Sequence, residues 1–385
     1  MIAYELGAVP RVFIGRGAVD RLPEIVGGLG ASSALLVVDQ AVAATGWSAR
    51  VAATFRDAVA VVEHLVPPGE PTVTSVDAAA DAARRLDGVV VVGIGGGSAL
   101  DTAKQAAVVC TAAVGVSHSL LGVNAFAGRR PIVAIPTTSG TGAEVTRTCI
   151  LSDAHGRKMW TWGDEMLPDA VILDPTATAS MPPHVTTSTG LDALVHAIEA
   201  CTGQRRNPLS TAVALHAMTL VLDHLPAAVA HAEDLAARQA MQEAALLAGI
   251  AIDNCGTGIA HAIGHALGSL YHVPHGTAVA VGLDAALAWN VRGAPDVFEV
   301  VGAALGRAAA ELPDILTDLF TATSFEQAVR HGPDVAFDAR DIAAMMAAPE
   351  NEPMLRNNCV MPDAAERFEL AAETVDRWRV LRGAS

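Results

Sequence analysis

The chain has 385 residues, of which 51% are hydrophobic and 17% are charged. This composition excludes an intrinsically disordered protein, and the length exceeds what one ordinary hydrophobic core holds, so two domains are expected. A formal net charge of −16 disfavours a nucleic-acid partner, because phosphate binding needs a basic surface. No uninterrupted apolar run reaches the roughly 18 residues of a membrane helix, so we expect a globular protein without a membrane partner.

The N-terminal residues and the cysteines bear on the cellular compartment. Met1–Glu5 has neither the basic nor the apolar region of an export signal. The five cysteines are an odd number, widely spaced, and form no C-x-x-C pair, a pattern that is typical of reduced thiols. We therefore expect a cytoplasmic protein, and the composition favours an enzyme.

Strand-like and helix-like segments alternate through the first half of the chain. Apolar runs rich in β-branched residues predict strands at 34–38, 60–66, 88–94, 131–135 and 170–173. Alanine-rich stretches with helical spacing lie between several of them, at 75–86 and 100–113. This alternation predicts a parallel sheet wrapped by helices, as in a Rossmann-like dinucleotide-binding domain.

The strand pattern stops near Met181, and the rest of the chain is rich in alanine and leucine with helical periodicity. Pro182 and Pro183 mark a natural junction, because proline ends one element and suits the first turn of the next. We expect an α/β domain at residues 1–180 and an all-helical domain at residues 181–385.

A glycine-rich turn follows the predicted strand 88–94. Gly95, Gly96, Gly97 and Ser98 would let the backbone approach a pyrophosphate, whose charge a helix N-terminus favours. Ser98 and Asp101 have the spacing of a capping box, which predicts Ser98 as the N-cap. Because the third glycine of the G-x-G-x-x-G fingerprint is missing, a plain structural turn remains an alternative.

Two further strand ends carry polar side chains. The strand at 131–135 leads into a loop with Thr137, Thr138 and Thr141, whose hydroxyls could hold a ribose and phosphates. Asp39 ends an early strand and could accept hydrogen bonds from a ribose 2′-hydroxyl, which would favour NAD over NADP. An ordinary polar loop and a helix-capping aspartate are the structural alternatives.

Two stretches of the helical half predict a metal site. Asp192 and His196 are four residues apart, and so are His261 and His265, which places each pair on one face of a helix. His275 follows ten residues after His265. Carboxylate and imidazole groups at this spacing are ligands of divalent transition metals, so we expect a metal centre there.

Lysine is rare in this chain. Of 25 basic residues, 23 are arginine, and only Lys104 and Lys158 are lysine. Such a chain either keeps lysine where a compact ammonium group is needed, or retains two lysines by chance under a codon bias.

Four motifs together resemble the iron-containing (group III, metal-dependent) alcohol dehydrogenases over nearly the full length of the chain. They are GGGSALDTAK, PTTSGTGAEVT, GLDALVHAIEA and HAIGHALGSLYHVPHG, at 95–104, 136–146, 190–200 and 261–276. Four long motifs in the same order make the resemblance far more specific than any one of them.

The resemblance implies a role for each set of candidate residues. The metal ligands would be Asp192, His196, His261 and His275. The dinucleotide would lie along Gly95, Gly96, Gly97, Ser98, Asp101, Thr137, Thr138 and Thr141, with Lys158 nearby and Asp39 as the acid of NAD-preferring members. His265 would lie beside the nicotinamide and assist catalysis, and His272 would relay a proton.

The implied activity is that of a metal-dependent, NAD(H)-linked alcohol dehydrogenase or aldehyde reductase (EC 1.1.1.-). Hydride would pass between the nicotinamide and a small alcohol or aldehyde, in a site between the two domains. Fe²⁺ is the expected metal, with Zn²⁺ as the alternative, because imidazole and carboxylate ligands suit both. The resemblance also implies a homo-oligomer, a dimer or larger.

Two other functions stay open at this point. The same superfamily contains lyases of the dehydroquinate-synthase kind, which use NAD and a metal but release phosphate. A non-catalytic metal-binding protein is the other alternative, although it leaves the two nucleotide loops unexplained.

The substrate is the least determined feature of the sequence. Arg147 or Arg356 would favour an anionic semialdehyde if either faced the substrate, and a solvated arginine is the alternative at each position. Trp160, Trp162 and the segment Met354–Cys359 are further candidates for shaping the pocket.

Overall fold

The structure, a computed structural model, describes residues 4–383, which divide into two compact units. The first is Ala8–Met181, and the second is Pro182 onward together with the segment that ends at Gly7. The predicted α/β domain, residues 1–180, includes that short segment. Its backbone explains the grouping, because the N–H of Gly7 donates a hydrogen bond to Asn254 Oδ1 at 2.7 Å.

A six-stranded parallel sheet forms the centre of the α/β unit, in the order β1-β8-β5-β4-β2-β3. Its strands are β1 (Arg11–Ile14), β2 (Ser33–Asp39), β3 (Ala60–Val66), β4 (Val89–Gly95), β5 (Ile132–Pro136) and β8 (Ala170–Leu173). Five of them match the predicted runs closely. The order of the strands reverses direction between the neighbours β2 and β4. In sheets of this kind, ligands bind beyond the carboxyl ends of the two strands at such a reversal.

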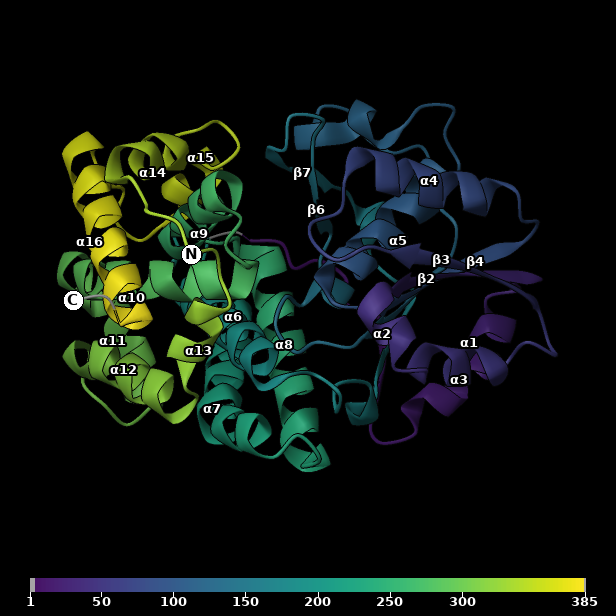
Figure 1. Cartoon of the computed structure of the whole chain (residues 1–385), viewed down its shortest axis with the longest axis horizontal. Coiled ribbons are helices and arrows are strands. Elements are labelled where there is room, and N and C mark those ends of the chain that lie inside the picture. Colours follow the sequence, from purple (N-terminus) through teal and green to yellow (C-terminus); the bar gives the residue numbers. More distant parts are fainter. Residues whose placement is uncertain (1–3, 384–385) are drawn as a thin grey trace. The chain divides into compact units, whose positions relative to one another are not determined.

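Alternating side chains of each central strand reach opposite faces of the sheet. Leu35 and Val37 pack on the face covered by helices α4 (Val73–Arg84) and α5 (Gly97–Val109). Leu36 and Val38 pack on the other face. Helices α1 (Leu22–Gly28) and α3 (Trp47–Ala53) cover that face, so the sheet is the middle layer of three (Figure 1).

The edge strand β1 and a separate antiparallel hairpin were not among the predicted elements. The hairpin consists of β6 (Thr148–Ser152) and β7 (Lys158–Trp162). The shorter elements of this unit are α2 (Gln40–Ala44) and the 3₁₀ helices η1 (Ala18–Arg21), η2 (Val116–Gly122), η3 (Ala143–Val145), η4 (Asp164–Met166) and η5 (Pro175–Ala177).

Among the described residues, the second unit contains helices and no strands, as the sequence predicts. Its helices are α6 (Pro183–Thr202), α7 (Pro208–Ala230), α8 (Leu235–Cys255), α9 (Ile259–Tyr271), α10 (His275–Gly293), α11 (Pro295–Ala304), η6 (Ala309–Glu311), α12 (Leu312–Ala322), α13 (Phe325–Arg330), α14 (Ala339–Met346), α15 (Glu352–Asn357) and α16 (Ala364–Arg382). In Figure 1 the C-terminal helix α16, in yellow, lies beside α10 and α14.

Small residues bring α6, α9 and α10 close together. A Cβ atom added at Gly276, in the first turn of α10, would lie 2.3 Å from the carbonyl oxygen of Ser188 on α6. A Cβ atom at Gly264 on α9 would lie 2.5 Å from Val279 Cγ1 on α10. These two positions therefore require glycine for the close approach of the three helices that carry the predicted metal ligands.

By length and composition, α7 could cross a membrane, and the bent pair α8–α9 would pass the same test if it counted as one span. One face of α7, including Ala214, Met218, Val221 and Leu225, packs into the core of the helical unit. These residues recur every three or four positions, which is the spacing of a helix that buries one face against its neighbours.

Candidate functional site

The glycine turn and the threonine loop lie against each other in the α/β unit. They follow the neighbouring parallel strands β4 and β5, and the N–H of Thr137 donates to the carbonyl oxygen of Gly95 at 2.9 Å. A Cβ atom at Gly96 would lie 3.1 Å from Thr138 Cγ2, and one at Gly97 would lie 3.0 Å from Thr141 Cγ2. The structure thus brings both predicted nucleotide loops together.

The start of helix α5 differs from the sequence prediction. Gly96 is the N-cap and, being glycine, has no side chain to cap the first turn. Ser98 is therefore inside the helix, and the predicted capping box with Asp101 is wrong: the Ser98 hydroxyl donates to the carbonyl oxygen of Gly69 at 2.8 Å. A first turn without a side-chain cap leaves backbone N–H groups for an anion such as a pyrophosphate.

Asp39 lies at the carboxyl end of β2, across the reversal of strand order from the glycine turn. A Cβ atom added at Gly95 would lie 2.8 Å from Asp39 Cβ. Asp39 also caps α2, because its Oδ1 accepts the N–H groups of Ala41 and Val42 at 2.8 and 3.1 Å. The capping alternative is therefore confirmed, and it leaves room for a second role because only one oxygen serves the cap.

Both lysines of the chain are buried in the α/β unit. The ammonium group of Lys104 donates to the carbonyl oxygens of Ala143 and Thr148 at 2.8 and 3.0 Å. It also lies 3.4 Å from Thr146 Oγ1 and 3.6 Å from Asp101 Oδ1. Lys104 therefore links helix α5 to the segment that follows the threonine loop.

The other lysine and Asp101 also have partners within this unit. Lys158 Nζ lies 2.8 Å from Glu70 Oε1. Asp101 is buried, and its Oδ2 accepts the N–H of Ile150 at 2.8 Å. The Asp101 carboxylate therefore holds helix α5 to strand β6. Its predicted place along the dinucleotide stays a prediction.

Two buried carboxyl groups near Lys104 have raised pKa values. Burial raises the pKa of Glu144 to about 7, against the opposing effect of Lys104. Burial raises the pKa of Asp101 to about 6, although Lys104 and the N–H of Ile150 oppose the rise. Removing a carboxylate from water disfavours its ionised form, and each group therefore takes up protons more readily than in the unfolded chain.

We expect the variant Glu144→Gln to be less sensitive to pH than the native chain. The raised pKa means that ionisation of Glu144 lowers the free energy of unfolding as the pH rises from about 4.5 through about 7. The stability of Glu144→Gln relative to the native chain should therefore increase over this range, as measured by urea denaturation at several pH values. A difference that stays constant with pH would contradict this expectation, and the exposed Glu24→Gln serves as the control.

Four predicted metal ligands meet in the helical unit. Asp192 and His196 lie one turn apart on α6, His261 lies in the first turn of α9, and His275 begins α10. The Nε2 atoms of His196, His261 and His275 lie 3.6, 3.9 and 3.7 Å from Asp192 Oδ1. One ligand atom from each residue lies within 4.8 Å of the others.

This arrangement fits a divalent metal ion. Donor atoms bound to one cation at about 2.0–2.2 Å lie roughly 3–4 Å apart, as the three histidine nitrogens do from Asp192 Oδ1. Asp192 is 1% exposed and His261 is 3% exposed, and among the described residues Asp192 Oδ1 and His261 Nε2 have no hydrogen-bond partner. Buried polar atoms without a partner are costly, and a cation between them would satisfy both.

Glu199, for which the sequence predicted no role, lies beside this cluster. Its Oε2 lies 2.6 Å from His261 Nδ1. Burial opposes ionisation of Glu199, yet His261 and the N–H of Gly258 outweigh it and lower the pKa of Glu199. The spacing of Asp192, His196 and Glu199 along one helix face was the signal that could have identified it.

The two histidines predicted to assist catalysis lie in different surroundings. His265 is buried one turn after His261 on α9, and its ring centroid lies 5.7 Å from that of His275. His272 is exposed and ends α9 in the left-handed conformation, with φ of 57°. His265 therefore borders the cluster, and a proton-relay role for His272 stays a prediction.

The arginines considered for substrate binding have local partners. Arg147 lies 3.1 Å from Asp164 Oδ1, and its guanidinium carbon lies 5.3 Å from the ring centre of Trp162. Trp160 lies across the hairpin from Ile150. Arg356 is an exposed residue paired with Glu352, which is the solvated alternative.

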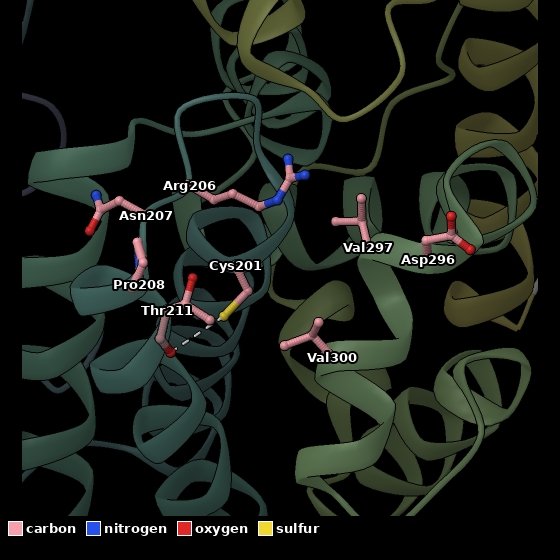
Figure 2. A pocket seen from close by; sticks show the side chains of 8 residues that line it. All are labelled: Cys201, Arg206, Asn207, Pro208, Thr211, Asp296, Val297 and Val300. Carbon is pink, nitrogen blue, oxygen red and sulfur yellow. Dashed lines mark hydrogen bonds between the residues drawn. The ribbon is translucent and has the colours of Figure 1, made fainter. Parts of the chain in front are cut away.

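A pocket of about 380 Å³ lies in the helical unit but contains none of the predicted site residues. The end of α6 and the beginnings of α7 and α11 line it, and Cys201 lies in its wall (Figure 2). Burial raises the pKa of the Cys201 thiol to about 12, so the thiol stays protonated at neutral pH. Cys201 is therefore not an activated thiol.

Comparison with known proteins gives two family matches along the chain. The model of the iron-containing alcohol dehydrogenases matches residues 10–175. The model of the C-terminal part of the Fe-containing alcohol dehydrogenase family matches residues 186–358.

Individual relatives agree with these matches. The NAD-dependent methanol dehydrogenase of Bacillus methanolicus is 35% identical over 325 residues, which are 83% of each chain. The sulfoacetaldehyde reductase of Bilophila wadsworthia is 35% identical over 78% of each chain. Among solved structures, sulfoacetaldehyde reductase from Bifidobacterium kashiwanohense, in complex with NAD⁺, superposes with a TM-score of 0.87 at 27% identity. That match covers 97% of this chain and 99% of the other.

Proposed function

Because this chain belongs to the iron-containing alcohol dehydrogenase family, we propose that it interconverts a small alcohol and its aldehyde with NAD(H) as the hydride carrier. The observation that carries this proposal is the meeting of three imidazole nitrogens around Asp192 Oδ1 in a buried cluster. Asp192, His196, His261 and His275 would hold a divalent metal, Fe²⁺ first and Zn²⁺ as the alternative.

The metal would supply Lewis acidity toward the oxygen of the alcohol or aldehyde, which favours hydride transfer at the adjacent carbon. The chain's own residues prepare the cluster for this task. The contact of His261 Nδ1 with Glu199 leaves Nε2 as the nitrogen with a lone pair, since each nitrogen of a neutral imidazole has one role. Burial of Asp192, His196 and His261 excludes water from most of the cluster. We propose that His265, one turn after His261 on α9, lies beside the reacting groups and assists catalysis.

The dinucleotide would bind in the α/β unit, at the loops after β2, β4 and β5. The uncapped first turn of α5 supports a pyrophosphate site at Gly95, Gly96, Gly97 and Ser98. We assign Thr137, Thr138 and Thr141 to the same ligand because their loop lies against this turn. Lys158 and Asp39 complete the set, with Asp101 in a supporting position.

The relatives also guide proposals for the substrate and the assembly. Methanol and sulfoacetaldehyde, named for two relatives, share a small carbon skeleton and an alcohol or aldehyde group. We propose a small substrate of this kind, a homo-oligomer of two or more copies, and a cytoplasmic location. The relatives described above are dehydrogenases and reductases, which favours hydride transfer over the lyase alternative.

An aldehyde panel tests the proposed function. The purified protein is loaded with Fe²⁺ or Zn²⁺ and supplied with NADH or NADPH, and absorbance at about 340 nm reports cofactor oxidation. We expect steady NADH consumption with short aldehydes and NADH formation with the corresponding alcohols. NAD-dependent phosphate release from a sugar phosphate without net NADH formation would support the lyase instead.

Asp39→Asn tests the proposed preference for NAD. Asparagine can still cap α2, but it no longer repels a 2′-phosphate as a carboxylate does. We expect the ratio of kcat/KM for NAD to that for NADP to fall at least about tenfold. Two like charges roughly 4 Å apart repel each other by about 1 kcal/mol in water and about 4 kcal/mol near a protein surface, and about 1.4 kcal/mol corresponds to a factor of ten. The cap substitution Asp234→Asn on α8 should leave the ratio unchanged, and an unchanged ratio in Asp39→Asn would exclude this role.

A further inference from the structure

One buried carboxylate binds both a proposed metal ligand and the helix that carries it. Besides its 2.6 Å contact with His261 Nδ1, the Glu199 carboxylate accepts the N–H groups of Gly258 and Ala260 at 2.7 and 2.8 Å. Helix α9 begins at Ile259, with Gly258 as its N-cap and no capping contact from the N-cap side chain. Glu199 on α6 therefore caps α9 from outside the helix, in the role that an N-cap side chain usually has.

A second side chain holds the same turn of α9. Asn358 Oδ1 accepts the N–H of Ile259 at 3.2 Å, and its Nδ2 donates to Asn290 Oδ1 and to the carbonyl oxygen of Val360. A Cβ atom added at Gly258 would lie 3.0 Å from Asn358 Oδ1 and 3.1 Å from Glu199 Oε1. The first turn of α9 is thus enclosed by two buried polar side chains from distant parts of the sequence.

The charges of the buried groups point to the same arrangement. A divalent cation bound by Asp192 and three neutral histidines would leave one positive charge without a counterion. Glu199 is 5% exposed and contacts His261, so its carboxylate would supply the missing negative charge within the protein. Buried charges are stable only when they are paired and hydrogen-bonded, and Glu199 meets both conditions.

From these contacts we propose that Glu199 is the positioning residue of the metal centre. It fixes the orientation of His261 and the start of α9 together, and Asn358 holds the same turn of α9. Metal affinity and the order of residues 256–262 are then coupled, because both depend on the same carboxylate. The proposal rests on the proposed function only in its assumption that the four-residue cluster binds a divalent metal.

Glu199→Gln tests the proposal, because glutamine has nearly the same shape and keeps one oxygen acceptor. Co²⁺ affinity is measured by competition with a chelator, and Co²⁺ absorption reports the ligand geometry. Hydrogen exchange of residues 256–262 is followed with and without Co²⁺. We expect the Kd for Co²⁺ to rise about 10- to 100-fold and exchange in this segment to quicken, since contacts behind a metal ligand typically have effects of this size.

Two further variants separate positioning from general stability. Asp234→Asn removes the charge of another carboxylate that accepts two N–H groups at a helix start, and it should leave Co²⁺ affinity unchanged. Asn358→Ala should raise the Kd by less than Glu199→Gln does, and it provides the test if Glu199→Gln fails to fold. An unaltered Kd in a folded Glu199→Gln protein would overturn the proposal. If His261→Ala also binds Co²⁺ as tightly as the native chain, the metal site itself is misassigned.

Discussion

Replacing His261 with alanine is expected to abolish metal binding and alcohol oxidation while NAD still binds. His261 Nε2 faces Asp192 Oδ1 in the cluster, and its loss leaves a divalent ion with one ligand fewer and a buried gap. Lewis-acid stabilisation is worth several kcal/mol, so kcat/KM should fall by roughly 10³-fold or more. NAD binding should persist because the glycine turn and the threonine loop belong to the α/β unit.

The measurement combines metal content after dialysis, steady-state kinetics and NAD affinity from fluorescence titration. His216→Ala is the matched control, because His216 is an exposed histidine on α7 and lies outside the cluster. It should retain the metal and the activity. Native turnover by a His261→Ala protein that is verified to be metal-free would refute the ligand assignment.

Lys104→Met is expected to cause the largest loss of stability among single substitutions in the α/β unit outside its apolar core. Methionine leaves the carbonyl oxygens of Ala143 and Thr148 without the ammonium donor and removes the charge next to Asp101. Breaking a buried ion pair by removing one partner costs about 3–5 kcal/mol. Because Lys104 links α5 to the segment after the threonine loop, NAD affinity should fall as well.

Urea denaturation measures the free energy of unfolding, and fluorescence titration measures the Kd for NAD. Arg21→Met is the control, because the exposed pair of Arg21 with Glu24 has the same sequence separation and should contribute less than about 1 kcal/mol. If Lys104→Met cost no more than Arg21→Met, the buried ammonium group would be dispensable for the fold.

The sequence predicted the parts of the fold whose signal is local. β2 and β4 each contain a long apolar run, which in β4 is mostly β-branched, because both faces of a central parallel strand are covered by helices. β1 has four residues and β7 includes the exposed Trp162, so neither has a long apolar run. The edge strand β1 pairs with β8, whose residues lie far away in the sequence, and a single sequence does not reveal such pairing. The hairpin strands β6 and β7 are joined by a longer loop, residues 153–157, which lacks the two-residue turn that signals a hairpin most strongly.

The candidate site was predicted where spacing along a helix determines which side chains share a face. Asp192 and His196 were identified in this way, but the ligand role of His275 came from the family resemblance, since His275 begins a different helix from His261. Ser98 was misplaced because the N-cap of helix α5 is Gly96, two residues before Ser98. Glu199 was missed because its partners lie about 60 residues away in α9 and the residues before it.

Because both lysines are buried, the folded α/β unit should not react with reagents that acylate side-chain amines. Lys104 is 0% exposed and Lys158 is 8% exposed, and the described surface presents arginine as its basic side chain. Amine acylation at either position must wait for the surrounding structure to open, because the reagent needs the uncharged, solvated amine. The rate of lysine acylation therefore reports local unfolding around the nucleotide loops, because the chain has no other lysine that would react.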